Sequence, residues 1–364
     1  MVPFTGRTAE LRQIRAALWD QTGTLVVGEA GSGKSRLLEE SVPGYQAVKV
    51  AGAGPAVPFG AFAHLLPAVP PPGNPIRWAA DLLTAEVVAV DDAHLLDAPS
   101  AALVRHLVEH RGARLVATAL TGATLPPPLA ALWKDGLVTR LDLGPLSAQD
   151  TARLLAAALG GQVEGVTARR LWHATRGNPR LLVELIASGQ FTRSGGLWRR
   201  QGEIVLTGRL RQLIEAAIGE VDEHERETME FVAFGEPLLL EALLALVPAD
   251  AVDRLERRGL IAVDHSPPRV RLAHPLHSQV VRTWPGRVRT RSGLATVIPF
   301  CAGQPDAELS VREREIARLA SWNLTNREIA DLLVVSPRTV GNHLCRIYAK
   351  LGVNRRLDLA RLLA

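Results

Sequence analysis

The densest group of residues able to do chemistry lies near the start of the chain, in the segment GEAGSGKS at residues 28–35. This segment matches the GxxxxGK[ST] phosphate-loop pattern in full. Its glycines let successive backbone N–H groups turn toward an anion, Lys34 brings a cation to the β- and γ-phosphates, and Ser35 offers an oxygen ligand to Mg²⁺. A chance glycine-rich turn is the alternative, and the scarcity of lysine, four against 38 arginines, disfavours it. The predicted nucleotide contacts here are Gly28, Gly31, Ser32, Gly33, Lys34, Ser35 and Arg36.

A second acidic element follows the phosphate loop, in the sequence EVVAVDD at residues 86–92. It predicts a buried strand that ends in two carboxylates. We expect Asp91 to hold Mg²⁺ together with Ser35, and Asp92 to orient or deprotonate an attacking water. Such acidic pairs also cap helices and turns, but their position after a phosphate loop favours the metal and catalytic roles.

The elements around these residues alternate between strands and helices. An apolar, β-branched run at 24–27 precedes the loop, a helical segment follows it from residue 36, and RLVATA at 114–119 predicts a further strand. This alternation predicts a parallel α/β sheet. We place a P-loop domain at residues 1–150 and a helical lid at 151–200.

Composition sets the wider frame. The chain has 364 residues, of which 47% are hydrophobic and 22% charged, enough for two or three globular domains. Its two cysteines, Cys301 and Cys345, provide no disulfide framework or paired metal motif. The N-terminus lacks a secretory pattern, and we find no apolar run long enough to cross a membrane. These features predict a cytoplasmic protein without a membrane partner.

The last 56 residues, 309–364, hold the excess positive charge of the chain. They contain nine Arg and one Lys against five Asp or Glu, a net charge of +5, which equals the net charge of the whole protein. Three helix starts are predicted there, by Ser310-x-x-Glu313, Thr325-x-x-Glu328 and Ser336-Pro337. A basic helical module on a neutral body indicates contact with nucleic acid.

The third of these helices, at about 337–351, has two distinct faces. A 100° helical wheel places on one stripe the predicted core residues Val340, Leu344, Ile347 and Leu351. The opposite face carries Arg338, Asn342, Cys345, Arg346 and Ala349. Small residues allow close approach, Asn can pair with adenine, and Arg can bind guanine or phosphate, so this face suits the major groove.

The middle of the chain, residues 201–283, predicts short amphipathic helices and then a hairpin of strands at 258–263 and 269–272. Helices followed by a hairpin favour a winged-helix-like domain. An arginine-containing linker is expected at 284–308. Such a run is normally a solvated arm, although it could also approach a phosphate backbone.

The first half resembles the ATPase module of the STAND class of AAA+ signal-transducing proteins. The resemblance rests on Gly6-Arg7-x-x-Glu10-Leu11, the phosphate loop, VVAVDDAHLLD, LDLGPLS at 141–147 and Thr175-Arg176-Gly177-Asn178-Pro179. It implies that Gly6, Arg7, Gly177 and Pro179 contact the adenine end of the nucleotide. It also suggests a β-phosphate contact for His274, for which a partly buried structural histidine is the alternative. Relatives carry a γ-phosphate-sensing arginine after the third strand, where this chain has Leu120-Thr121, so hydrolysis is expected to be slow or absent.

The C-terminal module resembles the LuxR-type DNA-binding domain along its whole length, from Leu309 to Val353. A helical docking domain with a solvated basic face is the alternative. Carried over by position, the predicted DNA contacts are Thr325, Asn326, Arg327, Ser336, Arg338, Thr339, Asn342, His343, Arg346, Lys350, Arg355 and Arg356. Relatives often have basic residues where Gly341 and Cys345 stand, which leaves the base preference open.

Together these features predict a multidomain chain: an α/β P-loop NTPase domain with a helical lid and winged helix, then an all-α helix-turn-helix domain at 309–364. The combination resembles ATP-binding LuxR-type transcriptional regulators in a short form, without the helical-repeat sensor that usually precedes the DNA-binding domain. It implies ATP or ADP and Mg²⁺ as cofactors, double-stranded DNA as partner, a homo-oligomer when active, and RNA polymerase as a further candidate partner. A DNA-localised ATP-hydrolysing machine and a degenerate, constitutive regulator are the alternatives.

Overall fold

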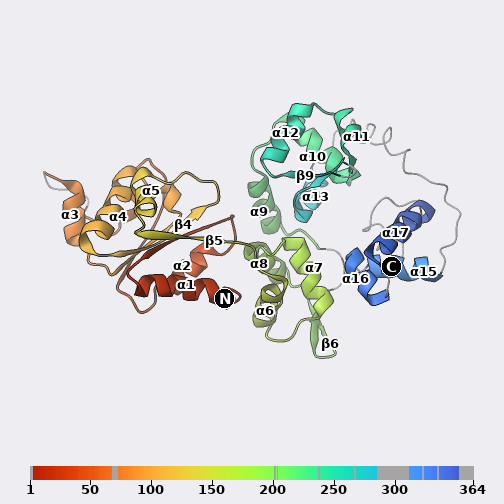
Figure 1. The fold of residues 1–364 in the computed structure, drawn as a ribbon, viewed down its shortest axis with the longest axis horizontal. Coiled ribbons are helices and arrows are strands. Elements are labelled where there is room, and N and C mark those ends of the chain that lie inside the picture. Colours follow the sequence, from red (N-terminus) through yellow and green to blue (C-terminus); the bar gives the residue numbers. More distant parts are fainter. Residues whose placement is uncertain are drawn as a thin grey trace. The chain divides into compact units, whose positions relative to one another are not determined.

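The computed structural model describes residues 3–67, 73–200, 202, 204–236, 238–265, 268–284, 311–321, 324–333 and 336–351. The chain divides into two compact units, Met1–Leu210 and Arg211–Ala364. Figure 1 shows the elements of each unit. No helix in the described ranges is both long and apolar enough to span a bilayer.

A five-stranded parallel sheet forms the centre of the first unit. Its strands are β1 (Gly23–Gly28), β2 (Ala47–Ala51), β3 (Val87–Asp91), β4 (Arg114–Leu120) and β5 (Val138–Leu143). They lie in the order β2-β3-β4-β1-β5 and every neighbouring pair is parallel. This arrangement confirms the predicted parallel α/β sheet and is that of a P-loop NTPase fold. Because the strands are parallel, the residues that follow β1, β3 and β4 meet at one edge.

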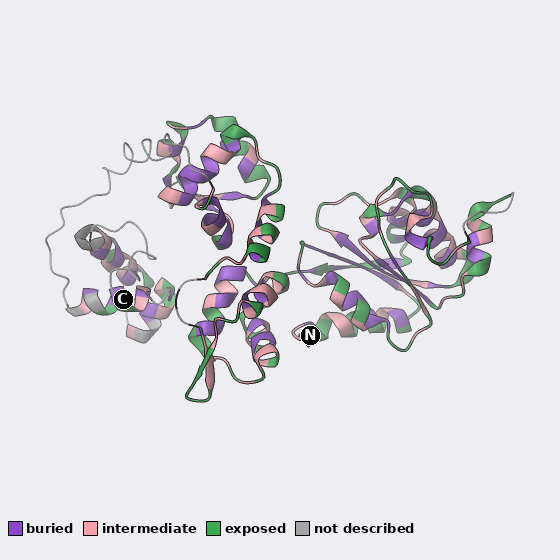
Figure 2. Cartoon of the chain, turned by 180° about the vertical axis from the view of Figure 1, so that it is seen from behind, coloured by how far each residue is buried: buried purple, intermediate pink, exposed green. Residues whose placement is uncertain are grey.

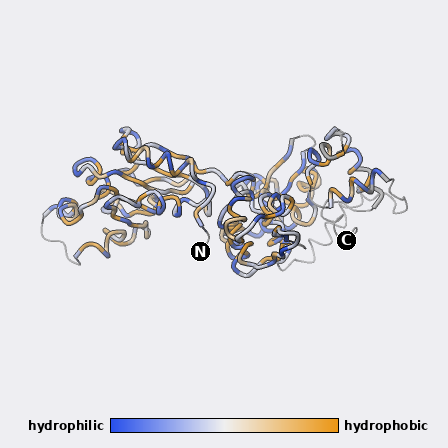
Figure 3. The backbone as a smooth tube through the Cα atoms, turned by 90° about the horizontal axis from the view of Figure 1, so that it is seen from below, coloured by the Kyte–Doolittle hydropathy of each residue, from blue (hydrophilic) through white to orange (hydrophobic). Residues whose placement is uncertain are grey.

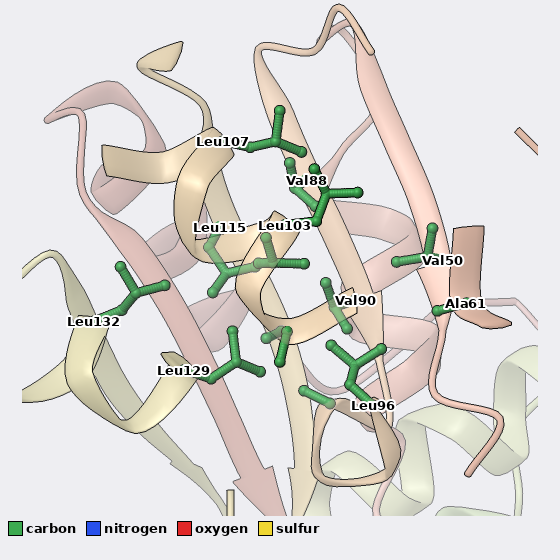
Figure 4. Close-up of a cluster of buried hydrophobic side chains, with 14 of the residues drawn as sticks. Val50, Ala61, Val88, Val90, Leu96, Leu103, Leu107, Leu115, Leu129 and Leu132 are labelled. Atoms are coloured by element: carbon green, nitrogen blue, oxygen red, sulfur yellow. The ribbon is translucent and has the colours of Figure 1, made fainter. Parts of the chain in front are cut away.

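Helices cover both faces of this sheet. On one face lie α1 (Thr8–Trp19) and α2 (Lys34–Ser41), and on the other α3 (Pro75–Leu82), α4 (Ala98–Arg111) and α5 (Pro127–Lys134), with the short 3₁₀ turns η1 (Gly60–Phe62) and η2 (Ala93–Leu95) beside them. Leu103 and Leu107 of α4 and Leu132 of α5 pack with Val88 and Leu115 of the sheet (Figure 4). Strands β1, β3 and β4 are buried along most of their length (Figure 2), as a sheet covered on both faces requires.

Three helices and a small hairpin follow the sheet within the same unit. They are α6 (Ala148–Leu159), α7 (Gly165–Thr175), α8 (Pro179–Ala187), β6 (Thr192–Ser194) and β7 (Leu197–Arg199). Ser147 caps α6 and Asn178 caps α8, each through a side-chain oxygen that accepts backbone N–H groups. Helix α9 (Gly208–Ile218) begins in this unit and continues into the second.

The first part of the second unit contains helices and a three-stranded sheet, and the winged-helix-like domain expected there stays a prediction. Its first elements are α10 (Glu223–Gly235), β8 (Leu238–Leu239), α11 (Leu240–Leu244), α12 (Ala249–Arg257), β9 (Ile261–His265), β10 (Pro268–Leu272) and α13 (Pro275–Val281). β9 and β10 pair antiparallel, as the sequence predicts, and β8 adds to β10. Strand β9 begins about three residues later than the predicted first strand of the hairpin, because Gly259 takes a positive φ of 66° after α12. Apart from Trp284, the predicted linker lies outside the described residues.

Between residues 311 and 351, the described part of the C-terminal module contains the helices α15 (Val311–Ser321), α16 (Asn326–Leu333) and α17 (Pro337–Leu351). Their hydrophobic positions meet in one small core. Figure 3 shows the hydropathy of the residues along the backbone of the chain. Val340, Leu344 and Ile347 are buried in that core, as the helical wheel predicts. Thr325 and Glu328 form the predicted capping box, since Thr325 N donates to Glu328 Oε2 at 2.9 Å and Glu328 N to Thr325 Oγ1 at 3.3 Å.

Candidate nucleotide site and DNA-binding face

A cavity of about 660 Å³ in the first unit is lined by the phosphate loop. The other walls come from the N-terminal segment, the end of the sheet, helix α8 and the start of α9. Among the predicted residues, the cavity is lined by Arg7, Gly31, Ser32, Gly33, Lys34, Ser35, Arg36, Asp92 and Pro179. Apolar side chains, including Phe4, Leu146, Leu154 and Val183, line it as well. A mostly apolar pocket with a polar loop suits a ligand that has an apolar base and a charged phosphate end.

The glycines of the loop are required by close contacts. A Cβ on Gly28 would lie 2.7 Å from Leu143 O, and one on Gly31 would lie 2.7 Å from Asn178 Oδ1. Gly31 and Gly33 also have positive φ values of 77° and 96°. The loop conformation therefore depends on residues without side chains at these positions.

Lys34 is buried at the start of α2. Its Nζ donates to two carbonyls of the loop itself, Gly28 O and Glu29 O, both at 2.9 Å. Burial lowers the pKa of Lys34, and the nearby carboxylates of Asp92, Asp91 and Glu29 partly offset this effect. The loop thus holds a desolvated cation for which a phosphate would be a stronger acceptor than a carbonyl.

Ser35, Asp91 and Asp92 come together at the edge of the sheet, and Thr118 of β4 joins them. Ser35 Oγ donates to Asp91 Oδ1 at 3.0 Å. Thr118 Oγ1 donates to the same oxygen at 2.5 Å and accepts the Asp92 N–H at 2.9 Å. Asp92 has φ 47°, in the left-handed region, and lines the cavity.

This donor set fits Mg²⁺. A serine hydroxyl and a carboxylate oxygen lie 3.0 Å apart next to the phosphate loop, and Mg²⁺ prefers such hard oxygen ligands. Ser35 and Asp91 would hold the ion, which would neutralise phosphate charge. In the described part of the chain, no cluster of three or more His, Cys, Asp or Glu offers another metal centre.

Arg7 braces the loop from the N-terminal side. Its Nη2 donates to Ser32 O at 3.2 Å and to Gly144 O at 2.5 Å, and its Nη1 pairs with Glu10 at 2.9 Å. Gly6 has φ 83°, and a Cβ there would lie 2.9 Å from the Asp150 side chain. Arg7 therefore lines the cavity and also fixes the loop to the segment after β5.

The Gly177-Asn178-Pro179 turn lies directly against the phosphate loop. Asn178 Nδ2 donates to Ala30 O at 2.9 Å, while its Oδ1 accepts from the backbone N–H groups that start α8. Arg180 N donates to Gly31 O at 3.3 Å. A Cβ on Gly177 would lie 2.3 Å from Leu146 O, so only glycine fits this turn.

Several residues that line or support the cavity were missed by the sequence reasoning. Leu120 lines it, with no arginine at that point, as the sequence shows. However, Arg180 and Arg209 line the same cavity and were not predicted, and neither were Thr118 or Glu184. Asn178 belongs to the Gly-Asn-Pro turn that the resemblance places at the nucleotide, but its hydrogen bond to the loop was not predicted. The arginine directly after the Gly-Asn-Pro turn was the available signal for Arg180. Arg36, which was predicted, forms an ion pair of 2.8 Å with Glu40.

His274 belongs to the second unit, whereas the phosphate loop belongs to the first. It is the N-cap of α13, where its Nδ1 accepts the Leu276 N–H at 3.2 Å. This local contact matches the structural alternative, and the phosphate contact stays a prediction.

The predicted DNA-binding residues are arranged along α16 and α17. Asn326 and Arg327 open α16, and Ser336 lies 2.7 Å through its Oγ from Thr339 Oγ1 at the start of α17. Asn342 is exposed, and His343 is half-buried. Helix α17 includes Arg338, Arg346 and Lys350, but the structure does not describe their side chains. Arg355 and Arg356 lie outside the described residues.

Comparisons with known proteins identify this C-terminal module. Residues 307–363 match the family "Bacterial regulatory proteins, luxR family". A putative HTH-type transcriptional regulator of Mycobacterium tuberculosis is 51% identical over 51 residues, which are 14% of this chain and 6% of that protein. The DNA-binding transcriptional activator DevR/DosR of the same species is 41% identical over 56 residues, 15% of this chain and 26% of that protein. The module is therefore a LuxR-type DNA-binding domain, and the chain spans only a small part of these relatives' length.

Among solved structures, the chain is similar to a STAND protein with a tetratricopeptide repeat sensor from Pyrococcus horikoshii. That similarity has a TM-score of 0.38 and 16% identity, over 95% of this chain and 52% of that one. A Walker-type ATPase of Pyrococcus abyssi gives a TM-score of 0.44 and 15% identity, over 77% of this chain and 96% of that one. The assignment of the first unit as a P-loop NTPase fold rests on its own strand order and phosphate loop.

Proposed function

We propose that this chain is a bacterial transcription regulator that binds double-stranded DNA through its LuxR-type domain, and that ATP or ADP in the first unit controls this binding. One observation carries the proposal. A cavity lined by residues 30–35 of the phosphate loop, next to a serine and a carboxylate suited to Mg²⁺, occurs in the same chain as a LuxR-type domain. Nucleotide would act as a conformational ligand, which requires little turnover.

The site residues divide by chemistry. Lys34 and the loop N–H groups would bind the phosphates, Ser35 and Asp91 would hold Mg²⁺, and Arg180 would add a cation from α8. The adenine end would occupy the apolar part of the cavity. In the DNA-binding domain, Asn342 and the arginines of α17 would contact base edges, while the start of α16 would contact phosphate.

The test is a comparison of DNA binding in three nucleotide states. Fluorescence anisotropy with a labelled duplex would be measured with Mg²⁺-ATP, with Mg²⁺-ADP and without nucleotide, for the wild type and Lys34→Ala. We expect the wild-type curves to differ between states and the Lys34→Ala curves to coincide. Coincident wild-type curves would contradict nucleotide control, and reciprocity requires DNA to change nucleotide affinity by the same factor.

A second candidate function is an ATP-hydrolysing machine that uses the LuxR-type domain only to localise on DNA. The placement of Asp92 in the cavity and of Arg180 nearby favours it. Steady turnover that DNA stimulates and Asp92→Asn abolishes would support this candidate. A constitutive regulator would bind DNA without binding any nucleotide.

The remaining assignments follow from the leading proposal. Regulators with this domain act at promoters in the cytoplasm, so a homo-oligomer on DNA and contact with RNA polymerase are the expected assemblies. Analytical ultracentrifugation with and without ATP would test the oligomer.

A further inference from the structure

One ion pair in the cavity wall connects α8, which lies within the first unit, with α9, which continues into the second unit. Arg209 Nε lies 2.9 Å from Glu184 Oε1, and both residues line the cavity. Glu184 is on α8, and its side chain is only 12% exposed, whereas that of Arg209, at the start of α9, is 75% exposed. The Glu184 carboxylate is therefore shielded from solvent, whereas the Arg209 guanidinium is mostly solvated.

Helix α8 is tied to the phosphate loop at its first turn. Asn178 Nδ2 donates to Ala30 O, and Arg180 N donates to Gly31 O. Gly31 leaves no room for a Cβ against Asn178. Glu184 follows Arg180 by one helical turn, so its position depends on the part of the loop that would hold phosphate.

Helix α9 leads out of the cavity wall. Its first turn belongs to the first unit, and there Leu210 is fully buried and its N–H donates to Thr207 Oγ1, just before the helix, at 3.2 Å. Its last turn is fixed in the second unit, where Ile218 O accepts from Arg258 Nη2 at 2.8 Å. Arg258 is itself held by an ion pair of 2.8 Å with the buried Glu225. Thus α9 has in its first turn a residue that lines the cavity, and it ends in the second unit of the chain.

We propose that the Glu184–Arg209 pair is the contact through which a bound nucleotide fixes the first turn of α9, with Arg209 as a positioning residue. This coupling, which rests on the proposed function, is electrostatic. A nucleotide brings several negative charges into a cavity that already contains the poorly solvated Glu184 carboxylate. The two anions repel each other unless a cation lies between them, and Arg209 then faces both and is held more tightly. Nucleotide binding therefore strengthens the Glu184–Arg209 ion pair, and this pair restricts the movement of the first turn of α9.

This arrangement predicts that Arg209→Gln and Glu184→Gln change the affinity for nucleotide in different directions. Arg209→Gln leaves Glu184 uncompensated, so Kd for Mg²⁺-ATP should rise about three- to tenfold, the order of a partly screened charge contact. Glu184→Gln removes the repulsive carboxylate, so affinity should equal or exceed that of the wild type. The double variant should return to within about twofold of the wild-type Kd, because the two changes are coupled.

The matched control is Arg153→Gln, because Arg153 forms a comparable pair with Asp150 on α6, at 3.1 Å, and is not among the residues lining the cavity. It should change neither nucleotide affinity nor DNA binding. Thermal unfolding of each variant with a fluorescent dye checks that the fold is retained. The exposed Arg209 side chain makes a folding defect from its replacement unexpected.

The decisive readout is the ratio of DNA affinities with and without Mg²⁺-ATP in the full chain. In Arg209→Gln, Glu184→Gln and the double variant, the logarithm of this ratio should fall to half of its wild-type value or less. This loss is expected even in variants that bind nucleotide normally. Wild-type ratios in the variants, or equal weakening of ATP binding by Arg209→Gln and Glu184→Gln, would overturn the inference. A wild type without any ratio would instead contradict the proposed function, while the nucleotide titrations would still test the pair.

Discussion

The Thr118 hydroxyl donates to Asp91 Oδ1 at 2.5 Å and accepts the backbone N–H of Asp92 at 2.9 Å. One buried side chain of β4 therefore orients both acidic residues at the end of β3. Ser35 donates to the same Asp91 oxygen, so the threonine also aligns the carboxylate with the phosphate loop. We infer that Thr118 orients the carboxylate of Asp91, the proposed Mg²⁺-binding residue, before nucleotide or metal binds.

Replacing Thr118 with Val should weaken Mg²⁺-dependent nucleotide binding. Valine has nearly the same shape but leaves the Asp92 N–H and one Asp91 contact unpaired. The loss of these interactions should cost about 1–3 kcal/mol. We expect the gain in ATP affinity on adding Mg²⁺ to shrink about tenfold, measured by titrating a fluorescent ATP analogue with Mg²⁺ and with EDTA.

Thr118→Ser is the matched control, since it keeps the hydroxyl. It should retain most of the Mg²⁺ effect at a small cost in packing. If valine and serine behaved alike, the hydroxyl would have no role in preparing Asp91.

Asn178 has two separable functions, capping α8 and contacting the loop through Nδ2. Asn178→Ser should keep the cap, because serine is a good N-cap residue, but it is too short to replace the contact with Ala30 O. We expect thermal stability within about 1 kcal/mol of the wild type and a nucleotide affinity lower by about three- to tenfold, measured by isothermal titration calorimetry. Unchanged affinity would show that the loop does not depend on α8.

How much of this site the sequence could predict depends on separation along the chain. The phosphate loop and the strand that ends in Asp91 are local patterns, and the P-loop fold they imply is confirmed by the strand order. Asn178 meets Ala30 across 148 residues, and no local pattern reports such a contact. Thr118 was overlooked because a β-branched residue in a buried strand is ordinarily explained by packing alone.

The ionisation of Lys34 should make the affinity for nucleotide depend on pH. Burial lowers its pKa in the free protein, and a bound phosphate would favour the charged form and raise it. Between these two pKa values, binding must take up a proton, so ATP affinity should fall as pH rises through that window. Calorimetry in two buffers with different ionisation enthalpies would detect the proton.

Lys34→Arg is the control for this effect, because guanidinium does not titrate in the range. Its affinity is expected to be lower overall but independent of pH across the same window. Proton uptake of equal size in the arginine variant would assign the titration to another group.

Glu225 connects helices α10 and α12 of the second unit through a buried carboxylate. It pairs with Arg254 Nε at 3.2 Å and with Arg258 Nη1 at 2.8 Å, and it completes the capping box of Asp222. Glu225→Ala should cost about 1–3 kcal/mol, below the value for a fully buried pair, because both guanidinium groups are about a third exposed. Faster amide hydrogen exchange in α10 and α12 would measure the loss, and Glu256→Ala on exposed α12 surface should leave exchange unchanged.

Gly341 lies inside α17, where nothing in the described fold requires a glycine. A Cβ there would meet only Asn326 Nδ2, at an ordinary distance of 3.5 Å. Gly341→Ala should therefore stabilise the helix by about 0.5–1 kcal/mol. Because related domains often carry larger, basic side chains at this position, a side chain there is compatible with bound DNA. We therefore expect alanine to raise the melting temperature and to change DNA affinity by less than about twofold. Gly165→Ala in α7, where a Cβ meets nothing within 4 Å, should stabilise without affecting DNA. A clear loss of DNA affinity in Gly341→Ala alone would show instead that duplex DNA approaches the α17 backbone too closely for a side chain at this position.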